Sequence, residues 1–308
     1  MTDPGQPGTG RDGLRTRRQG RRARMTLAPR TLALTLAALL AFAGNSLLCR
    51  LALRTGTIDP ASFGTIRLAA GALTLAIVVR ARHSRAGAAR DPWAAAMLFA
   101  YVAFFSWAYL GLTAGTGALV LFGAVQITMF AVGLRGGERF GAVACCGAAL
   151  AVAGLVYLVA PGVAAPPPLA AGSMAVAGVA WGVYTLRGRG IADPLAATAA
   201  NFAWATPLAV ALSLLAWSSA KVAPEGVALA IASGAITSGI GYVIWYAALR
   251  GLTALQAATV QLAVPLVAAF GGVLWLGEAI TPRLALASAA ILGGIALVLG
   301  TRARRARR

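Results

Sequence analysis

The chain is poor in charged and titratable residues. Charged residues make up 11% of its 308 positions, only eight are acidic, and there are one histidine and three cysteines. A soluble domain carries about 25% charged residues, so the composition excludes an ordinary water-soluble protein. The histidine and cysteines lack metal-ligand spacing, and the cysteines are expected to be small buried hydrophobic residues. We therefore predict no metal, no cofactor and no enzymatic activity.

Long apolar runs fill the chain instead. Apolar residues account for 59% of the sequence, and the mean hydropathy is +0.78. A bilayer crossing needs about 20 mainly apolar residues, so runs of this length predict transmembrane helices. The expected fold is an all-α integral membrane protein with ten transmembrane helices, near residues 31–49, 61–79, 93–111, 116–134, 141–160, 170–187, 195–217, 226–249, 252–276 and 283–300.

The net charge of +19 is concentrated at the two ends of the chain. Eight arginines fall in the first thirty residues and five in the last seven. Neither end contains an aromatic residue to stack on bases, so we expect no nucleic-acid partner. The expected partners are the lipid bilayer and a small-molecule substrate. Residues 1–30 are predicted to form a disordered basic cytoplasmic tail, and residues 301–308 a second basic cytoplasmic tail.

The distribution of arginines also predicts the orientation. With the N-terminus in the cytoplasm, 22 of the 27 basic residues fall on the cytoplasmic side and four outside. This bias follows the positive-inside rule. We predict a multi-pass protein of the cell membrane with both termini in the cytoplasm. The first apolar run could also be a secretion signal, but nine crossings follow it, which favours a retained anchor.

The two halves of the chain repeat each other. Gly-Leu-Thr-Ala at 111–114 recurs at 251–254, and Gly-Glu at 137–138 recurs at 277–278, both with an offset of 140. Asp-Pro at 59–60 recurs at 193–194 with an offset of 134. Residues 31–160 and 170–300 are therefore predicted to be two five-helix repeats. Because five is odd, the second repeat is inverted in the membrane, as in many secondary transporters.

These motifs resemble a known family. The Gly-Leu-Thr-Ala helix start, the following helix with Pro265, and its Leu-Gly-Glu ending at 276–278 are similar to EamA-type transporters of the drug/metabolite transporter superfamily. The first half departs from the pattern, with Val125 and Gly136 in place of Pro265 and Leu276. The resemblance implies a carrier that moves small organic solutes, often outward, without ATP.

Arg67 is the one basic residue predicted to lie inside a crossing. It falls about 4.5 Å from the centre of the run 61–79, where an arginine costs about 2.5–3.5 kcal/mol on insertion scales. One interpretation is an anion-binding or gating residue that faces a central cavity. The alternative is a structural arginine bonded to helix carbonyls, or a helix that begins later.

Further polar and aromatic residues fall inside the crossings. The offset of 134 aligns Arg67 with Asn201. Amides in a membrane either contact substrate or bond neighbouring helices, and aromatic residues either line a pathway or form the interfacial belt. The predicted substrate-binding residues are Arg67, Asn45, Gln126, Asn201, Gln261, Trp181, Tyr184 and Trp204, whereas Trp93, Trp107, Tyr109 and Trp217 are assigned to the belt.

Small residues and prolines are expected to shape the helices. Gly178 and Gly182 have the spacing that allows two helices to approach closely. Pro207 and Pro265 free backbone carbonyls inside crossings, which predicts either a hinge or a static kink.

The expected function is secondary transport of a small metabolite or drug, in the export direction, by alternating access. None of the eight acidic residues lies mid-membrane, which argues against a buried-carboxylate antiporter. Facilitated diffusion, or coupling through a glutamate at a helix end, remains open. Alternatives are a sensor or assembly subunit with a carrier-like fold and, with less support, an intramembrane enzyme.

Overall fold

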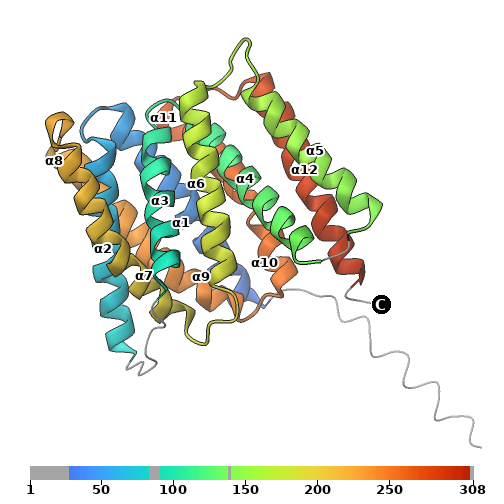
Figure 1. The fold of residues 1–308 in the computed structure, drawn as a ribbon, viewed down its shortest axis with the longest axis horizontal. Coiled ribbons are helices and arrows are strands. Elements are labelled where there is room, and N and C mark those ends of the chain that lie inside the picture. The colour runs from blue at the N-terminus through green and yellow to red at the C-terminus, as the bar shows by residue number, and fades with distance from the viewer. Residues whose placement is uncertain (1–27, 83–90, 138–139, 306–308) are drawn as a thin grey trace, which may run out of the picture.

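The computed structural model describes residues 28–82, 91–137 and 140–305. Most of the predicted N-terminal tail, the end of the C-terminal tail, and Glu138 lie outside these residues. The described chain is helical, with an isolated β-bridge between Ile58 and Val222. Its elements (Figure 1) are α1 (Pro29–Arg54), α2 (Pro60–Ala81), α3 (Pro92–Ala108), α4 (Ala114–Arg135), α5 (Ala142–Val159), α6 (Pro168–Arg187), α7 (Pro194–Leu215), η1 (Trp217–Ser219), α8 (Pro224–Ile231), η2 (Ala232–Ile240), α9 (Gly241–Leu249), α10 (Ala254–Val260), α11 (Ala263–Leu276) and α12 (Pro282–Arg305).

Aspartate-proline pairs determine where three of these helices begin. The side chains of Asp59, Asp91 and Asp193 accept hydrogen bonds from the first free backbone amides of α2, α3 and α7. Proline at the first helical position loses no hydrogen bond there, and its fixed φ suits a helix. The helix starts predicted near 61, 93 and 195 are therefore confirmed to within one residue. At the other end of the chain, α12 continues to Arg305, so the predicted tail at 301–308 is partly helical.

Ten membrane crossings account for these elements. Within the described residues, nine helical spans are long and apolar enough to cross a bilayer. The tenth, α3, has 17 residues, or about 26 Å of helix, and it is joined to the next crossing by a short turn. Two crossings are composite, because α8, η2 and α9 form one span and α10 with α11 form another. The all-α membrane fold predicted from the apolar runs is confirmed.

The break between α10 and α11 has a local cause. A proline ring clashes with the carbonyl four residues earlier, which for Pro265 is the carbonyl of Gln261. The structure interrupts the helix at this point, with the amide of Val264 bonded to the Gln261 oxygen at 3.0 Å. Pro207 lies inside α7 without interrupting it. Of the two prolines, only Pro265 therefore divides its crossing.

The helices are arranged as a central group with one pair beside it. In Figure 1, α5 and α12 run side by side at one edge of the molecule, and the other crossings surround the centre. Close packing is visible where α4 meets α6, since a Cβ placed on Gly178 would lie 2.6 Å from the Cβ of Ala124. The predicted packing role of Gly178 is confirmed. Cys145 and Cys146 on α5 are exposed, however, so only Cys49 is buried as predicted.

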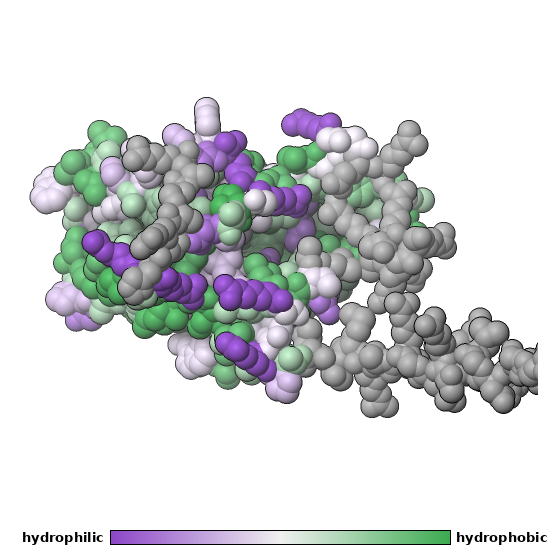
Figure 2. All heavy atoms as spheres, turned by 90° about the horizontal axis from the view of Figure 1, so that it is seen from below, coloured by the Kyte–Doolittle hydropathy of each residue, from purple (hydrophilic) through white to green (hydrophobic). Residues whose placement is uncertain are grey.

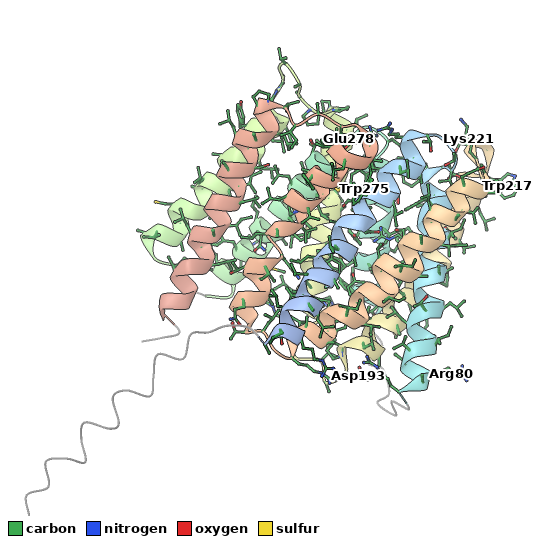
Figure 3. All side chains as sticks on the ribbon, turned by 180° about the vertical axis from the view of Figure 1, so that it is seen from behind. Arg80, Asp193, Trp217, Lys221, Trp275 and Glu278 are labelled. Carbon is green, nitrogen blue, oxygen red and sulfur yellow. The ribbon has the colours of Figure 1, made fainter. Side chains whose placement is uncertain are left out.

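Matched local structures support the predicted inversion of the two halves. Thr113 caps α4, and Thr253, 140 positions later, caps α10. The two caps Asp59 and Asp193 lie at opposite ends of the molecule, because Asp59 accepts a hydrogen bond from the Lys221 amide at 3.1 Å. Figure 3 shows Lys221 at one end and Asp193 at the other. Equivalent caps at opposite ends are what an inverted repeat requires.

The two ends also differ in their charged residues. Figure 3 places Glu278 and Lys221 at one end, called here the Glu278 end, and Arg80 and Asp193 at the other, called the Arg80 end. Figure 2 views the Arg80 end, where hydrophilic residues stand out among apolar helices. The site described next has its mouth at the Arg80 end and its floor towards the Glu278 end.

Candidate functional site

A cavity of 730 Å³ lies in the central group of helices. It is lined by residues of α1, α2, α3, α4, α6, α7, η2 and α9, together with Gln261. The exposed residues Arg187 and Arg189 border it, so it opens at the Arg80 end. Its deepest lining residues towards the Glu278 end include Ser46 and Phe105. The volume is in the range of small-molecule binding sites.

Arg67 on α2 lies in the wall of this cavity and is 2% exposed. Its Nε donates to the Ser238 hydroxyl at 3.4 Å, and Nη2 donates to the Tyr101 hydroxyl at 3.1 Å. The remaining nitrogen, Nη1, is buried without a hydrogen-bond partner in the described structure. The guanidinium also lies 5.0 Å from the ring centre of Phe105 and 5.3 Å from that of Tyr101. Its partners are therefore hydroxyls and rings, not helix carbonyls.

A polar network extends from Arg67 across three other elements. Asn45 on α1 donates from Nδ2 to the Tyr101 hydroxyl at 3.3 Å. Ser233 on η2 in turn donates to the Asn45 side-chain oxygen at 2.7 Å. Both hydrogen bonds to Tyr101 use its oxygen as acceptor, so its hydroxyl proton is available to a ligand.

The close approach of η2 to α2 builds part of this network. A Cβ on Gly234 would collide with the Arg67 carbonyl oxygen, so only glycine allows this contact. Residues Ala232–Ile240 form a π-helix, a wider turn that occurs frequently at functional sites. The π-helical turn carries Ser233 and Ser238, the partners of Asn45 and Arg67.

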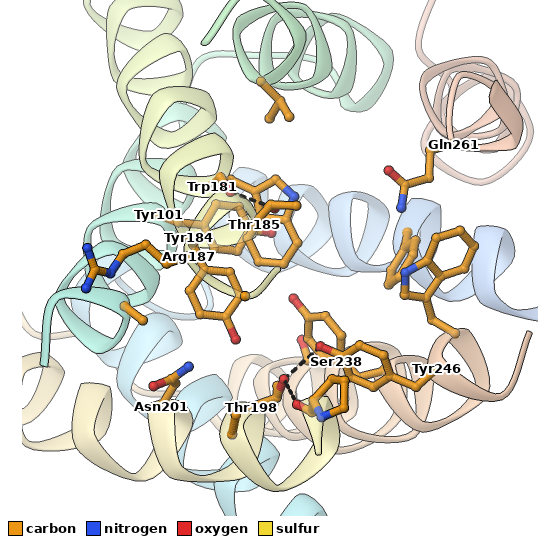
Figure 4. A pocket seen from close by; sticks show the side chains of 18 of the residues that line it. Tyr101, Trp181, Tyr184, Thr185, Arg187, Thr198, Asn201, Ser238, Tyr246 and Gln261 are labelled. Carbon is orange, nitrogen blue, oxygen red and sulfur yellow. Dashed lines mark hydrogen bonds between the residues drawn. The ribbon is translucent and has the colours of Figure 1, made fainter. Parts of the chain in front are cut away.

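An aromatic wall faces the polar network. Trp181 stacks on Tyr184, with ring centres 5.2 Å apart, and lies 4.8 Å from the Tyr101 ring. Tyr242 of α9 continues this wall, 6.0 Å from Trp181. Figure 4 shows Trp181, Tyr184 and Tyr101 gathered on one side of the pocket. Planar rings in this arrangement suit a flat or apolar ligand group.

Two further predicted residues line the cavity nearer its mouth. Asn201 on α7 and Gln261, at the break between α10 and α11, project into the space from separate walls (Figure 4). Between them, the hydroxyls of Thr198 and Tyr246 lie 2.8 Å apart. The proline-induced break therefore places an amide side chain on the cavity wall.

Not every predicted site residue reaches the cavity. Asn45, Arg67, Trp181, Tyr184, Asn201 and Gln261 line it. Gln126 does not, although its neighbour Val125 does. Trp204 was predicted to face the pathway, but it is 53% exposed on the outside of α7. Tyr109 was predicted for the interfacial belt, but it is fully buried beneath the closed end.

An ion pair lies at the Glu278 end, beyond the residues that line the cavity. Arg50 of α1 donates from Nε to Oε1 of Glu278 at 3.1 Å, and the two side chains are 17% and 8% exposed. Arg50 also donates to the carbonyl of Tyr109 at 2.9 Å. Glu278 accepts from the amide of Ala114 at 2.8 Å, at the N-terminus of α4. The pair thus joins α1, α11 and the turn between α3 and α4.

A second ion pair lies at the open mouth. Arg187 at the end of α6 donates to both carboxylate oxygens of Asp91, at 2.6 and 3.0 Å. The Arg187 hydrogen bonds hold the pKa of Asp91 below its usual value, against a smaller opposing effect of burial.

At the Glu278 end, burial acts to raise the pKa of Asp59, but hydrogen bonds from Ser62, Lys221 and Ala61 keep it lowered overall.

Several lining residues were not anticipated from the sequence. Tyr101 and Phe105 are four residues apart on α3, and Tyr109 follows four later, a spacing that places all three on one helix face. That stripe was the available signal. The roles of Ser233 and Ser238 had no such signal, since they depend on a π-helical turn. No group of three His, Cys, Asp or Glu side chains that could hold a metal occurs in the described part of the chain.

Comparison with known proteins supports this architecture. The EamA-like transporter family matches residues 169–300. The chain is 53% identical to Uncharacterized protein PA1977 of Pseudomonas aeruginosa over 280 residues, which cover 91% of this chain and 98% of that protein. A crystal structure of another protein superposes with a TM-score of 0.63 at 22% identity, covering 87% of this chain and 96% of the other. This last likeness concerns the fold alone.

A multi-pass helical bundle with a central cavity between repeated halves is the architecture of many secondary transporters. The chain belongs to the EamA-like transporter family, within the drug/metabolite transporter superfamily. The family resemblance drawn from the repeated Gly-Leu-Thr-Ala motif and the Leu-Gly-Glu ending at 276–278 is confirmed.

Proposed function

We propose that the protein is a secondary carrier of the cell membrane that exports a small organic solute by alternating access. The observation that carries this proposal is the asymmetry of the 730 Å³ cavity, which opens at the Arg80 end and is not lined by the Arg50–Glu278 ion pair at the other end. A carrier needs a site that reaches one side at a time. The described shape corresponds to one of its two end states.

The arginine distribution supports an orientation for this state. Arg80, Arg82, Arg187, Arg189 and Arg250 are described at the open end. By the positive-inside rule, this group of arginines supports a cytoplasmic location for that end and for both termini. The described state is then inward-open, ready to take a solute from the cytoplasm, and the Arg50–Glu278 pair lies on the outer side.

The proposal is tested by reconstituting the purified protein in liposomes preloaded with pooled metabolites. Loss of solutes is followed by mass spectrometry, with and without a pH gradient. We expect at least one solute to leave these liposomes faster than it leaves liposomes made without the protein. A change in that rate when a pH gradient is applied identifies proton coupling. Absence of protein-dependent flux for every solute, in preparations that remain monodisperse, would contradict a carrier. A reporter at the C-terminus that is active only outside would overturn the orientation.

A further inference from the structure

The charge of Arg67 has no counter-ion in the described structure. Its guanidinium is 2% exposed and bonded only to two neutral hydroxyls. An arginine remains protonated at any physiological pH. A buried cation without a partner is unfavourable, because desolvation is not offset by an opposite charge. The site is therefore incomplete as it stands.

The charges around the cavity do not supply the missing anion. The charged residues among its described lining are Arg67, Asp91, Arg187 and Arg189. The single carboxylate, Asp91, is engaged by Arg187. It also lies ten residues from Tyr101 along α3, about 15 Å at 1.5 Å per residue. The cavity therefore carries an excess of positive charge. Of its charged lining residues, Arg67 lies farthest from the mouth.

Arg67 and Tyr101, which both line the cavity, each have a donor that is not used within the described structure. Nη1 of Arg67 has no partner, and the Tyr101 oxygen is held by Arg67 and Asn45 with its own proton free. A guanidinium nitrogen beside a hydroxyl proton suits the two oxygens of a carboxylate. The ring of Trp181 lies 4.8 Å from that of Tyr101 and extends the site with an apolar surface.

We infer that the solute is an organic carboxylate with a flat apolar body, bound through its carboxylate to Arg67 and Tyr101 and through its body against Trp181. This inference rests on the proposed carrier function and specifies its substrate class. The solute completes the site by bringing the counter-ion that the protein lacks. Binding of the charge and alignment of the body then occur together, which favours anionic over neutral or cationic analogues.

The test uses three probes that share one ring system and differ in charge: 2-naphthylacetate, 2-naphthylacetamide and 2-(2-naphthyl)ethylamine. Their binding to the purified protein is measured by isothermal titration calorimetry. Because a hydrogen bond to a charged group is stronger than one to a neutral group, we expect the carboxylate to bind about tenfold or more tightly than the amide, and the amine to bind most weakly. Equal affinities, or tightest binding of the amine, would overturn the inference.

Variants of Arg67 test whether the preference for the carboxylate over the amide depends on this residue. Arg67→Gln should lower the affinity for naphthylacetate to that for the amide, whereas Arg67→Lys should retain part of the difference. A full preference in Arg67→Gln would contradict the assignment. If that variant does not fold, the comparison of probes on the unmodified protein still decides between the outcomes. Chloride that displaces naphthylacetate at equal concentration would identify an inorganic-anion site and overturn the substrate class.

The flux assay separates this inference from the proposed function. Transport of neutral or cationic solutes, with no competition from naphthylacetate, would leave the carrier intact and refute the carboxylate class. Arg67-dependent binding of naphthylacetate without any solute flux would support the anion site and refute the carrier.

Discussion

Arg50 and Glu278 are 228 residues apart in the sequence, yet Arg50 Nε lies 3.1 Å from Glu278 Oε1. Arg50 lies near the end of α1, and Glu278 directly follows Gly277, which ends α11 in a left-handed conformation with φ of 63°. The pair therefore connects the first helix of the first repeat to the fourth crossing of the second. In a carrier, breaking it should favour the state that opens at this end.

Replacement of Arg50 by Gln is expected to open the Glu278 end. Ser46, which lines the cavity just inside this end, is changed to Cys after Cys49, Cys145 and Cys146 are changed to Ala. A membrane-impermeant maleimide applied from outside should then label position 46 about fivefold faster with Arg50→Gln, because an ion pair of about 1 kcal/mol shifts a two-state population about fivefold when it is lost.

Arg283→Gln is the matched control for this labelling. Arg283 also lies at this end, but it bonds the carbonyls of Tyr157 and Ala160 at the end of α5, away from the cavity. It should leave labelling unchanged. Equal labelling in the Arg50 and Arg283 variants would contradict the assignment of Arg50 to closure.

Exchange of the two charges, Arg50→Glu with Glu278→Arg, is expected not to restore closure. Arg50 also donates to the Tyr109 carbonyl, and Glu278 also accepts from the Ala114 amide. After the exchange, a carboxylate faces a carbonyl and a guanidinium faces an amide, so both partners become repulsive. The same labelling assay measures the result, and recovery of the slow rate would show that the ion pair acts alone.

Trp181 and Trp204 should differ in their effect on ligand binding. Trp181 stacks with Tyr184 in the cavity, whereas Trp204 faces outward from α7. Trp181→Ala is expected to weaken binding of 2-naphthylacetate about three- to tenfold, since aromatic contacts contribute about 0.5–1.5 kcal/mol beyond area. Trp204→Ala, measured by the same calorimetry, should bind as the unmodified protein does. A larger loss in the Trp204 variant would place the pathway elsewhere.

The contrast between these tryptophans shows what the sequence can predict in a membrane protein. Helix positions depend on local signals, namely apolar runs and caps such as Asp59-Pro60, and these were predictable to within a few residues. Which face of a helix points inward is not local, because lipid and protein interior are both apolar and leave little amphipathic pattern on α7. For this reason the sequence did not indicate that Trp204 lies on the outer face of α7, where it is 53% exposed.

The network around Arg67 could likewise be predicted only in part, because its contacts join elements that are distant in the sequence. A charged residue within an apolar run can be recognised from the sequence alone, so Arg67 was identified. Its partners come from α3 and η2, which lie 34 and 171 residues away. Only the packing of α2 against η2, which Gly234 permits, brings them together. That Nη1 has no partner among the described residues is a property of that packing, not of any motif.

A side chain at position 178 should separate α4 from α6. Beyond its contact with Ala124, a Cβ there would lie 2.7 Å from the Leu121 carbonyl oxygen. Gly178→Ala is therefore expected to lower stability by about 1–3 kcal/mol, as overpacking does. Gly172→Ala on the same helix meets nothing within 4 Å and is the matched control. Thermal unfolding in detergent measures both, and equal melting temperatures would contradict this close contact.

The Asp91–Arg187 pair at the mouth should make stability depend on pH in the acidic range. The pKa of Asp91 is lowered in the folded protein by Arg187. The contribution of the pair is therefore complete above the unfolded pKa of about 3.9 and disappears as the pH falls through the lower folded value. Asp91→Asn keeps a side chain that can cap α3 but removes the charge, so it isolates the pair from the cap. The difference in melting temperature between the unmodified protein and this variant should be constant from about pH 8 to 5 and shrink below about pH 4.

Arg187→Gln should show the same difference, and the double variant should add nothing to it, because both changes remove one interaction. A difference that persists unchanged at low pH would mean that the cap, not the ion pair, stabilises the mouth.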